Sequence, residues 1–177
     1  MNKKNLIVVD LDNTLVPFDT FKLLVLKNIF NVNIIILLII RRLRLMSALR
    51  FKKNVIHILS DNNWLNKKMT NFVSEIISRI DKNIIEKVNK KTTRFDYIIL
   101  CSASPDIYVK EIAKRLGWQG FGSSLERDSL FHMFGINKIK FICEKFPTSK
   151  YFYKYSISNS LSDLELLKLF DFWEIKK

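Results

Sequence analysis

The sequence is short of residues that cross-link a chain or ligate soft metals. Its 177 residues include two cysteines and two histidines. The cysteines, Cys101 and Cys143, lie far apart and outside any CxxC pattern, which argues against a disulfide framework and a zinc cluster. The histidines, His57 and His132, are isolated and lack the spacing of metal ligands. We therefore expect a cytoplasmic protein whose chemistry does not rest on Cys or His.

Long apolar runs are also missing. The run Ile34–Ile40 is seven residues long, whereas a helix that spans a membrane needs about 20 apolar residues. The apolar stretch Leu6–Val9 is four residues long and ends at Asp10, so we expect no signal peptide. Cations at positions 41, 42 and 44 follow the first run. They leave weak contact with a membrane surface as an open alternative.

Acidic residues are scarce in one part of the chain. The whole sequence has 30 Lys and Arg against 17 Asp and Glu, a net charge of +13. Residues 17–94 hold 16 of these cations and 5 of the acids, and the remainder holds 14 and 12. A basic segment beside a nearly neutral one indicates attraction to an anionic ligand or surface. We expect no nucleic-acid partner, because the sequence has no RNP-like aromatic pattern and no Cys/His finger.

The periodicity of apolar residues predicts an α/β fold of one domain with an insertion. Leu6–Val9 is a short apolar run of the kind found in buried parallel strands. Residues 17–94 contain no glycine and repeat apolar residues every three or four positions, which predicts a helical block. Strands and helices then alternate. Further strands are predicted at Tyr97–Cys101, Trp118–Phe121, Leu125–Phe134, Tyr151–Ile157 and Phe172–Ile175, and helices at Pro105–Gly117, Lys138–Phe146 and Leu161–Phe170.

Two local signals predict boundaries between these elements. Ser104 followed by Pro105 predicts a helix start, with Ser as the N-cap and Pro as the first helical residue. Gly120-Phe121-Gly122 predicts a turn between two short strands.

Polar side chains gather just after the predicted strands or at helix starts. They are Asp10, Asp12, Ser102, Lys138, Asn159 and Asp163. In a parallel sheet such positions share one edge, where ligands bind. Carboxylates suit Mg²⁺, a hydroxyl and an ammonium can hold phosphoryl oxygens, and one carboxylate can attack phosphorus. The pattern therefore predicts magnesium-assisted phosphoryl transfer.

Four ordered motifs follow one another along the chain: Asp10-Leu11-Asp12-Asn13-Thr14-Leu15, Ile98-Ile99-Leu100-Cys101-Ser102-Ala103-Ser104-Pro105, Gly135-Ile136-Asn137-Lys138 and Ser158-Asn159-Ser160-Leu161-Ser162-Asp163. Through these motifs the sequence resembles the haloacid dehalogenase superfamily, in its phosphoserine-phosphatase-like branch, over essentially the whole chain. The resemblance implies a Rossmann-like three-layer core with a parallel sheet, formed by residues 1–16 and 95–177. It also implies an all-α cap, residues 17–94, inserted after the first strand.

The resemblance also implies a role for each matched residue. Asp10 would be the nucleophile and a Mg²⁺ ligand. Asp12 would protonate the leaving group and then activate water, with its main-chain carbonyl on the metal. Ser102 would donate a hydrogen bond to the phosphoryl group, and Lys138 would neutralise it. Lys140 is an alternative to Lys138, although Lys138 has the better spacing from Gly135.

The fourth motif departs from the family pattern. Asp163 matches the second acid of that motif, in a supporting position, but Asn159 stands where the family usually has a metal-binding Asp. An amide oxygen can ligate Mg²⁺ without carrying charge, so we expect weaker metal binding. Asp19 lies near where the family places a substrate-binding acid at the cap entrance. It can equally be a helix N-cap.

These motifs predict a Mg²⁺-dependent phosphomonoester hydrolase that acts on a small phosphorylated metabolite bound between core and cap. One alternative is a non-catalytic relative that binds a phosphorylated ligand, because Asn159 weakens the metal site. The other is a phosphotransferase that passes the group to an acceptor other than water. The sequence specifies neither the substrate nor the oligomeric state.

Overall fold

The protein has a six-stranded, mostly parallel sheet. The structure, a computed structural model, describes residues 3–61, 64–93, 96–126 and 129–176. The strands are β1 (Lys4–Val9), β2 (Tyr97–Pro105), β3 (Gln119–Glu126), β4 (Ser129–Phe131), β5 (Tyr151–Ser158) and β6 (Phe172–Ile175). Their order in the sheet is β4-β3-β2-β1-β5-β6, and only β4 runs antiparallel to its neighbour. The predicted α/β fold is confirmed.

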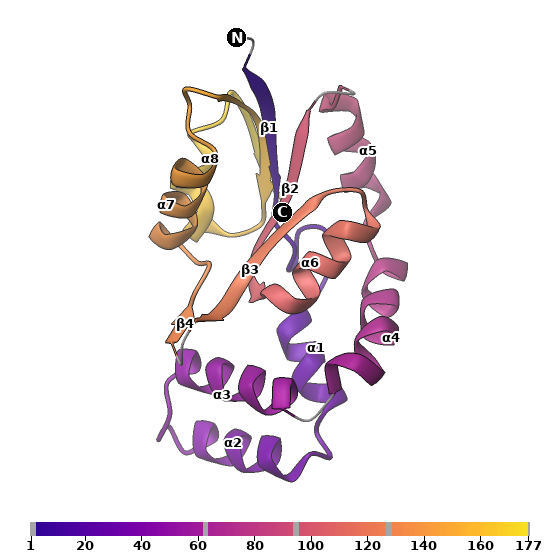
Figure 1. The fold of residues 1–177 in the computed structure, drawn as a ribbon, viewed down its shortest axis with the longest axis vertical. Helices are drawn as coiled ribbons and strands as arrows, with labels where there is room; N and C mark the ends of the chain where they lie inside the picture. The colour runs from indigo at the N-terminus through magenta and orange to yellow at the C-terminus, as the bar shows by residue number, and fades with distance from the viewer. Residues whose placement is uncertain (1–2, 62–63, 94–95, 127–128, 177) are drawn as a thin grey trace.

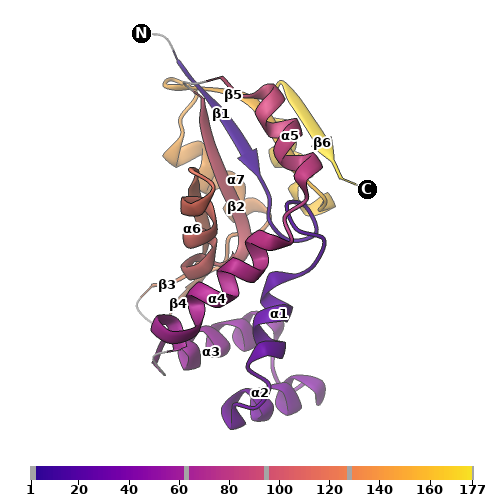
Figure 2. The same ribbon diagram turned by 90° about the vertical axis from the view of Figure 1, so that its right-hand side faces the viewer.

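A helical insert separates β1 from β2, as the sequence predicts. It consists of α1 (Thr20–Lys27), α2 (Val32–Arg42), α3 (Ala48–Asp61), α4 (Trp64–Ser78) and α5 (Lys82–Lys91). α2 and α3 lie beyond the end of the sheet, whereas α5 lies alongside it (Figures 1 and 2). The buried side chains of Ile84 and Val88 place α5 in the same apolar cluster as Ile7 of β1. Part of the insert thus packs on the core, and the exact core and cap boundaries stay a prediction.

Both faces of the sheet are covered by helices. α5 and α6 (Asp106–Arg115) lie on one face, and α7 (Ile136–Lys145) and α8 (Leu164–Leu167) lie on the other (Figure 1). Alternate residues of β1 enter two separate buried clusters, Ile7 and Val9 in one and Leu6 and Val8 in the other. A strand buried on both faces needs apolar residues at every position. This explains why the N-terminal apolar run is continuous.

The predicted turn at Gly120–Gly122 is wrong, because these residues lie inside β3. A Cβ at Gly120 would be 2.6 Å from the carbonyl oxygen of Val109 in α6. At Gly122 it would be 2.5 Å from the carbonyl oxygen of Ser104. The glycines therefore let neighbouring backbone approach the strand closely, which is a second common use of glycine in sheets.

The predicted cap of α6 is also wrong. β2 continues to Pro105, which is the N-cap residue of α6 and makes no side-chain cap bond, and the first helical residue is Asp106. Ser104 still belongs to β2, and its hydroxyl donates to Asp12 instead of capping the helix.

Two further elements are shorter than predicted. β4 covers only Ser129–Phe131 of the expected strand, and the chain then turns through Gly135, whose φ of 54° suits glycine. The expected helix Leu161–Phe170 is split into a 3₁₀ turn, Leu161–Asp163, and the short α8. Ser160 starts that turn, since its side chain accepts a hydrogen bond from the Ser162 N–H.

The close approach at Gly120 gives a testable consequence for stability. We expect Gly120→Ala to lower the free energy of unfolding by about 1–3 kcal/mol, because backbone and not a flexible side chain blocks the added methyl group. Denaturant unfolding measures this change. The matched control is Gly117→Asn, since Gly117 has a φ of 74° and no atom within 4 Å of an added Cβ. Asn tolerates that conformation, so similar losses in both variants would contradict the packing argument.

Candidate active site

A cavity of about 230 Å³ lies at the carboxyl ends of β1, β2 and β5. It is lined by Asp10, Asp12, Asn13, Ser102, Ala103, Met133, Phe134, Lys138, Asn159, Ser160, Ser162 and Asp163. All six polar residues predicted to share one sheet edge are in this set. The parallel order β2-β1-β5 brings them together, since it places three strand ends side by side.

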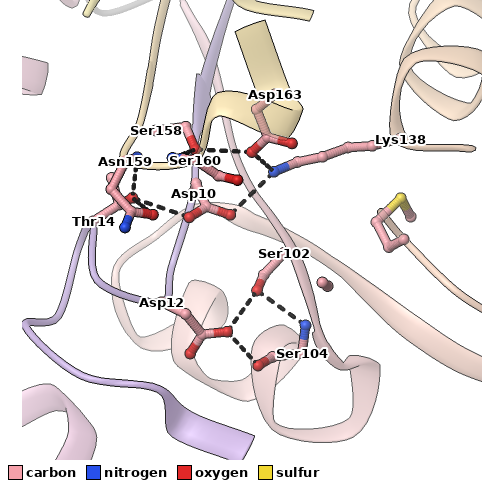
Figure 3. A network of polar contacts seen from close by, with 12 residues as sticks. Asp10, Asp12, Thr14, Ser102, Ser104, Lys138, Ser158, Asn159, Ser160 and Asp163 are labelled. Atoms are coloured by element: carbon pink, nitrogen blue, oxygen red, sulfur yellow. Dashed lines mark hydrogen bonds and ion pairs between the residues drawn. The ribbon is translucent and has the colours of Figure 1, made fainter. Parts of the chain in front are cut away.

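The loop after β1 points two carboxylates at different partners. The Asp10 N–H donates to the carbonyl of Ile157 at 3.0 Å, so the β1–β5 pairing extends to this residue. Asn13 then adopts a φ of 56°, a left-handed conformation that Asn tolerates better than most residues. Asp10 faces Thr14 and Lys138, whereas Asp12 faces the end of β2 (Figure 3). The pair therefore belongs to two hydrogen-bond networks.

The first network is centred on a buried lysine. Lys138, which is 2% exposed, lies in the first turn of α7. Its Nζ is 3.0 Å from Asp10 Oδ1 and 2.7 Å from Asp163 Oδ2. Asp163 also accepts a hydrogen bond from the Ser158 hydroxyl at 2.8 Å. Burial disfavours the ammonium, but the two carboxylates raise the pKa of Lys138 above its usual value.

The groups around Asp10 carry more negative than positive charge. Burial raises the pKa of Asp10 from 3.8 to about 6, and the charges of Asp163 and Asp12 add to this effect. Lys138 opposes the shift without cancelling it. One ammonium therefore does not balance the carboxylates around it, and a further cation would stabilise the ionised form of Asp10.

The hydroxyl of Thr14 joins Asp10 to Asn159. Thr14 Oγ1 donates to Asp10 Oδ2 at 3.0 Å and accepts from the Asn159 N–H at 2.8 Å. The amide oxygen of Asn159 is 3.4 Å from the same hydroxyl oxygen. The Thr14 hydroxyl thus holds a carboxylate oxygen and an amide oxygen near each other, beside uncompensated negative charge. This donor set fits Mg²⁺, which prefers hard oxygen ligands.

A metal ion bound by Asp10 and Asn159 would have an uncharged ligand beside the Asp10 carboxylate. Within the described ranges, no group of three or more His, Cys, Asp or Glu side chains is arranged to hold a metal ion. Asp163 supports Lys138 instead, through the ion pair and the Ser158 bond. We therefore expect weaker metal binding than at a site with three carboxylates.

The second network surrounds Asp12 with donors. Its carboxylate accepts hydrogen bonds from Ser104 Oγ at 2.5 Å, Thr20 Oγ1 at 2.6 Å, the Thr20 N–H at 2.7 Å and Ser102 Oγ at 3.3 Å. The Tyr108 hydroxyl lies 3.0 Å from Thr20 Oγ1. Because Thr20 is the first residue of α1, the insert itself holds Asp12.

Lys52 is a site neighbour that the sequence did not reveal. It lies on α3, and its Nζ donates to the carbonyl of Ala103 at 3.2 Å and lies 3.4 Å from His132 Nε2. Burial lowers the pKa of Lys52, and burial together with the Lys52 charge lowers that of His132 to about 4. A neutral His132 can therefore accept from Lys52. The apolar periodicity of α3 identifies Lys52 only as one of several helical lysines and gives no sign that it lies near the cavity.

Two further candidates from the sequence, Asp19 and Lys140, are not among the described residues that line this cavity. Asp19 is the N-cap of α1, where its carboxylate accepts from the Lys22 N–H at 2.8 Å. Lys140 lines a neighbouring cavity of about 470 Å³, which shares Met133 with the first. The geometry thus favours Lys138 as the lysine beside Asp10.

The raised pKa of Asp10 predicts how stability depends on pH in metal-free protein. The folded state keeps this proton up to about pH 6, whereas unfolded Asp releases it near 3.8. The contribution of Asp10 to the free energy of unfolding therefore falls by on the order of 2–3 kcal/mol as pH rises between these values. We expect denaturant unfolding of Asp10→Asn to lack this decline. Asp171→Asn, at an exposed position, should retain it, and parallel profiles for wild type and Asp10→Asn would contradict the assignment.

Known structures share this fold. The chain matches no protein-family model and no curated protein. It is similar to a protein of unknown function from Bordetella pertussis Tohama I, with 15% identity, a TM-score of 0.70, and coverage of 94% of this chain and 87% of that one. It is also similar to a HAD family hydrolase from Salmonella enterica serovar Typhi, with 14% identity, a TM-score of 0.58, and coverage of 99% of this chain and 64% of that one. A substrate-bound phosphoserine phosphatase is similar with 14% identity, a TM-score of 0.52, and coverage of 98% of this chain and 86% of that one. At these identities the likeness shows the fold of haloacid dehalogenase hydrolases.

Proposed function

We propose that the protein is a Mg²⁺-dependent phosphomonoester hydrolase that forms an aspartyl-phosphate on Asp10. The observation that carries this proposal is the buried Lys138–Asp10 pair, which shares one cavity with Ser102 and Asp12. The residues that we propose as nucleophile, proton carrier and phosphoryl-binding groups therefore lie at one sheet edge. The fold shared with haloacid dehalogenase hydrolases supports the same activity.

In the first step, a carboxylate oxygen of Asp10 attacks phosphorus and the bond from phosphorus to the ester oxygen breaks. Ser102 and Lys138 hold the phosphoryl oxygens as charge moves onto them. Asp12 must turn from Ser104 and Thr20 and carry a proton to the leaving oxygen. The alcohol then departs and the phosphoryl group stays on Asp10.

In the second step, water attacks the aspartyl-phosphate and Asp12 accepts its proton. The bond between phosphorus and Asp10 breaks, which releases inorganic phosphate and restores the carboxylate. Asp10, Asn159 and the main-chain carbonyl of Asp12 are the proposed Mg²⁺ ligands, as the resemblance implies. When bound, the ion would screen the negative charge between Asp10 and the phosphoryl group.

The substrate is proposed to be a small phosphorylated metabolite held between the core and the helical insert. The excess of cations in residues 17–94 suits an anionic substrate. Lys52 brings one of these cations to the backbone of Ala103, which lines the cavity. The insert can also exclude bulk water from the intermediate. We further propose a cytoplasmic location, supported by the unpaired state of Cys101 and Cys143.

The nucleophile is tested with a generic aryl phosphate, with and without Mg²⁺. We expect Mg²⁺-dependent release of phosphate by the wild type and loss of roughly 10³-fold or more in kcat for Asp10→Asn. Asp171→Asn is the matched control, because it removes an exposed carboxylate and should keep full activity. Activity that survives Asp10→Asn would sink this mechanism. A phosphorylated product formed only with an added alcohol would indicate transfer instead of hydrolysis.

The metal site is tested by restoring a carboxylate at position 159. We expect Asn159→Asp to lower the Mg²⁺ concentration needed for half-maximal activity by about tenfold, because a charged oxygen binds the ion more strongly than an amide. Titration of activity against Mg²⁺ measures this. The opposite result, an inactive wild type with turnover only in Asn159→Asp, would favour a phosphate-binding protein that does not catalyse.

A further inference from the structure

The helix α2 carries an exposed aliphatic stripe. Val32, Ile35, Ile36 and Ile39 are between 39% and 67% exposed, and their spacing of three, four and seven places them on one side of the helix. Ile34 and Leu37, on the other side, are buried in the main apolar cluster. α2 is thus apolar on two sides, and only one of them faces the protein.

Neighbouring side chains enlarge this stripe. Phe30 before the helix is 94% exposed, and Leu43 and Leu45 after it are 63% and 74% exposed. We call these residues together with the stripe the α2 face. In both ribbon views α2 is the element farthest from the sheet (Figures 1 and 2). Apolar groups gathered on one outer element mark an interaction site more often than scattered exposed residues do.

Cations border the α2 face without acidic residues between them. Residues 20–60 contain eight Lys and Arg and no Asp or Glu. Arg41, Arg42 and Arg44 are exposed and alternate with Leu43 and Leu45 at the end of the helix. This combination of aliphatic groups and one sign of charge matches a surface that is anionic outside and apolar just beneath.

We propose that the α2 face binds the surface of an anionic lipid bilayer, with α2 lying in the plane of the interface. The aliphatic stripe would enter the boundary between headgroups and acyl chains, and the arginines would contact the lipid phosphates. α2 is 11 residues long, and among the described residues no helix is long and apolar enough to cross a membrane. The contact is therefore peripheral.

Two other partners fit the α2 face less well. A second copy of the chain would bring two acid-free basic segments together, and like charges oppose that association. A nucleic acid would meet the cations but gain little from Val, Ile and Leu, since single strands bind to aromatic stacking surfaces. A bilayer uses both features. The inference does not rest on the proposed phosphatase activity.

Flotation of the full chain with lipid vesicles tests the proposal. We expect the protein to float with phosphatidylglycerol vesicles at low ionic strength, to bind less as salt rises, and to stay behind with phosphatidylcholine vesicles. Absence of flotation with phosphatidylglycerol at low salt overturns the proposal. Equal binding to both lipids would overturn the role of the arginines.

Two triple variants distinguish binding through the arginines of the α2 face from attraction by the overall positive charge of the protein. Each cation near an anionic bilayer contributes roughly a fivefold factor in partitioning, so Arg41→Gln, Arg42→Gln and Arg44→Gln together should weaken binding on the order of a hundredfold. The control replaces Lys82, Lys90 and Lys150, three exposed lysines outside α2 and its flanks, with Gln and should reduce binding far less. Equal losses would mean non-specific attraction and overturn the proposal.

The aliphatic stripe is tested separately. Val32→Gln, Ile36→Gln and Ile39→Gln together keep the charge and favour a helix, and we expect them to weaken vesicle binding at least tenfold with an unchanged thermal unfolding midpoint. Unchanged vesicle binding would overturn insertion of α2. Sedimentation velocity measures self-association, and a wild-type dimer that becomes a monomer in this variant without any vesicle binding would assign the face to a second copy.

Discussion

The buried ammonium of Lys138 between Asp10 and Asp163 is the contact on which the site depends. It joins Asp10, directly after β1, and Asp163, in the 3₁₀ turn after β5, to the first turn of α7. Removing one partner of a buried ion pair costs about 3–5 kcal/mol, because the remaining charge is left without compensation. The position of α7, the shape of the cavity and the ionisation of Asp10 are therefore coupled through one side chain.

The insert is coupled to the same cavity through Asp12. The N-terminus of α1 supplies two of the donors that hold its carboxylate, and Ser104 at the end of β2 supplies another. Any movement of α1 therefore changes what surrounds Asp12. The insert therefore contacts directly the residue that we propose as the proton carrier. Asp10 is held by Lys138 of α7 and by the carbonyl of Ile157 in β5, and the charge of Asp12 acts on its pKa.

Strong local patterns in the sequence predict the sheet, the helical insert and the grouping of six polar residues in one cavity. β1 could be predicted because a strand buried on both faces is apolar throughout. Ser104 and Gly120 could not, because their local sequence fits a cap and a turn as well as it fits what they do. Ser104 contacts Asp12, and Gly120 makes room for α6, so both roles depend on residues distant in the chain. Lys52 has no local signal at all.

The positive charge of the helical insert does not neutralise the negative charge of the cavity. Most cations of the insert are exposed and screened by water, so they do not balance Asp10, Asp12 and Asp163 in the cavity. A phosphoryl group adds further negative charge there, and Lys138 is already shared by two carboxylates. A divalent cation or a proton on Asp10 would therefore favour the binding of a phosphorylated ligand. In the proposed mechanism a bound divalent cation would keep Asp10 ionised beside the phosphoryl group, and that links the proposed catalysis to the oxygen of Asn159.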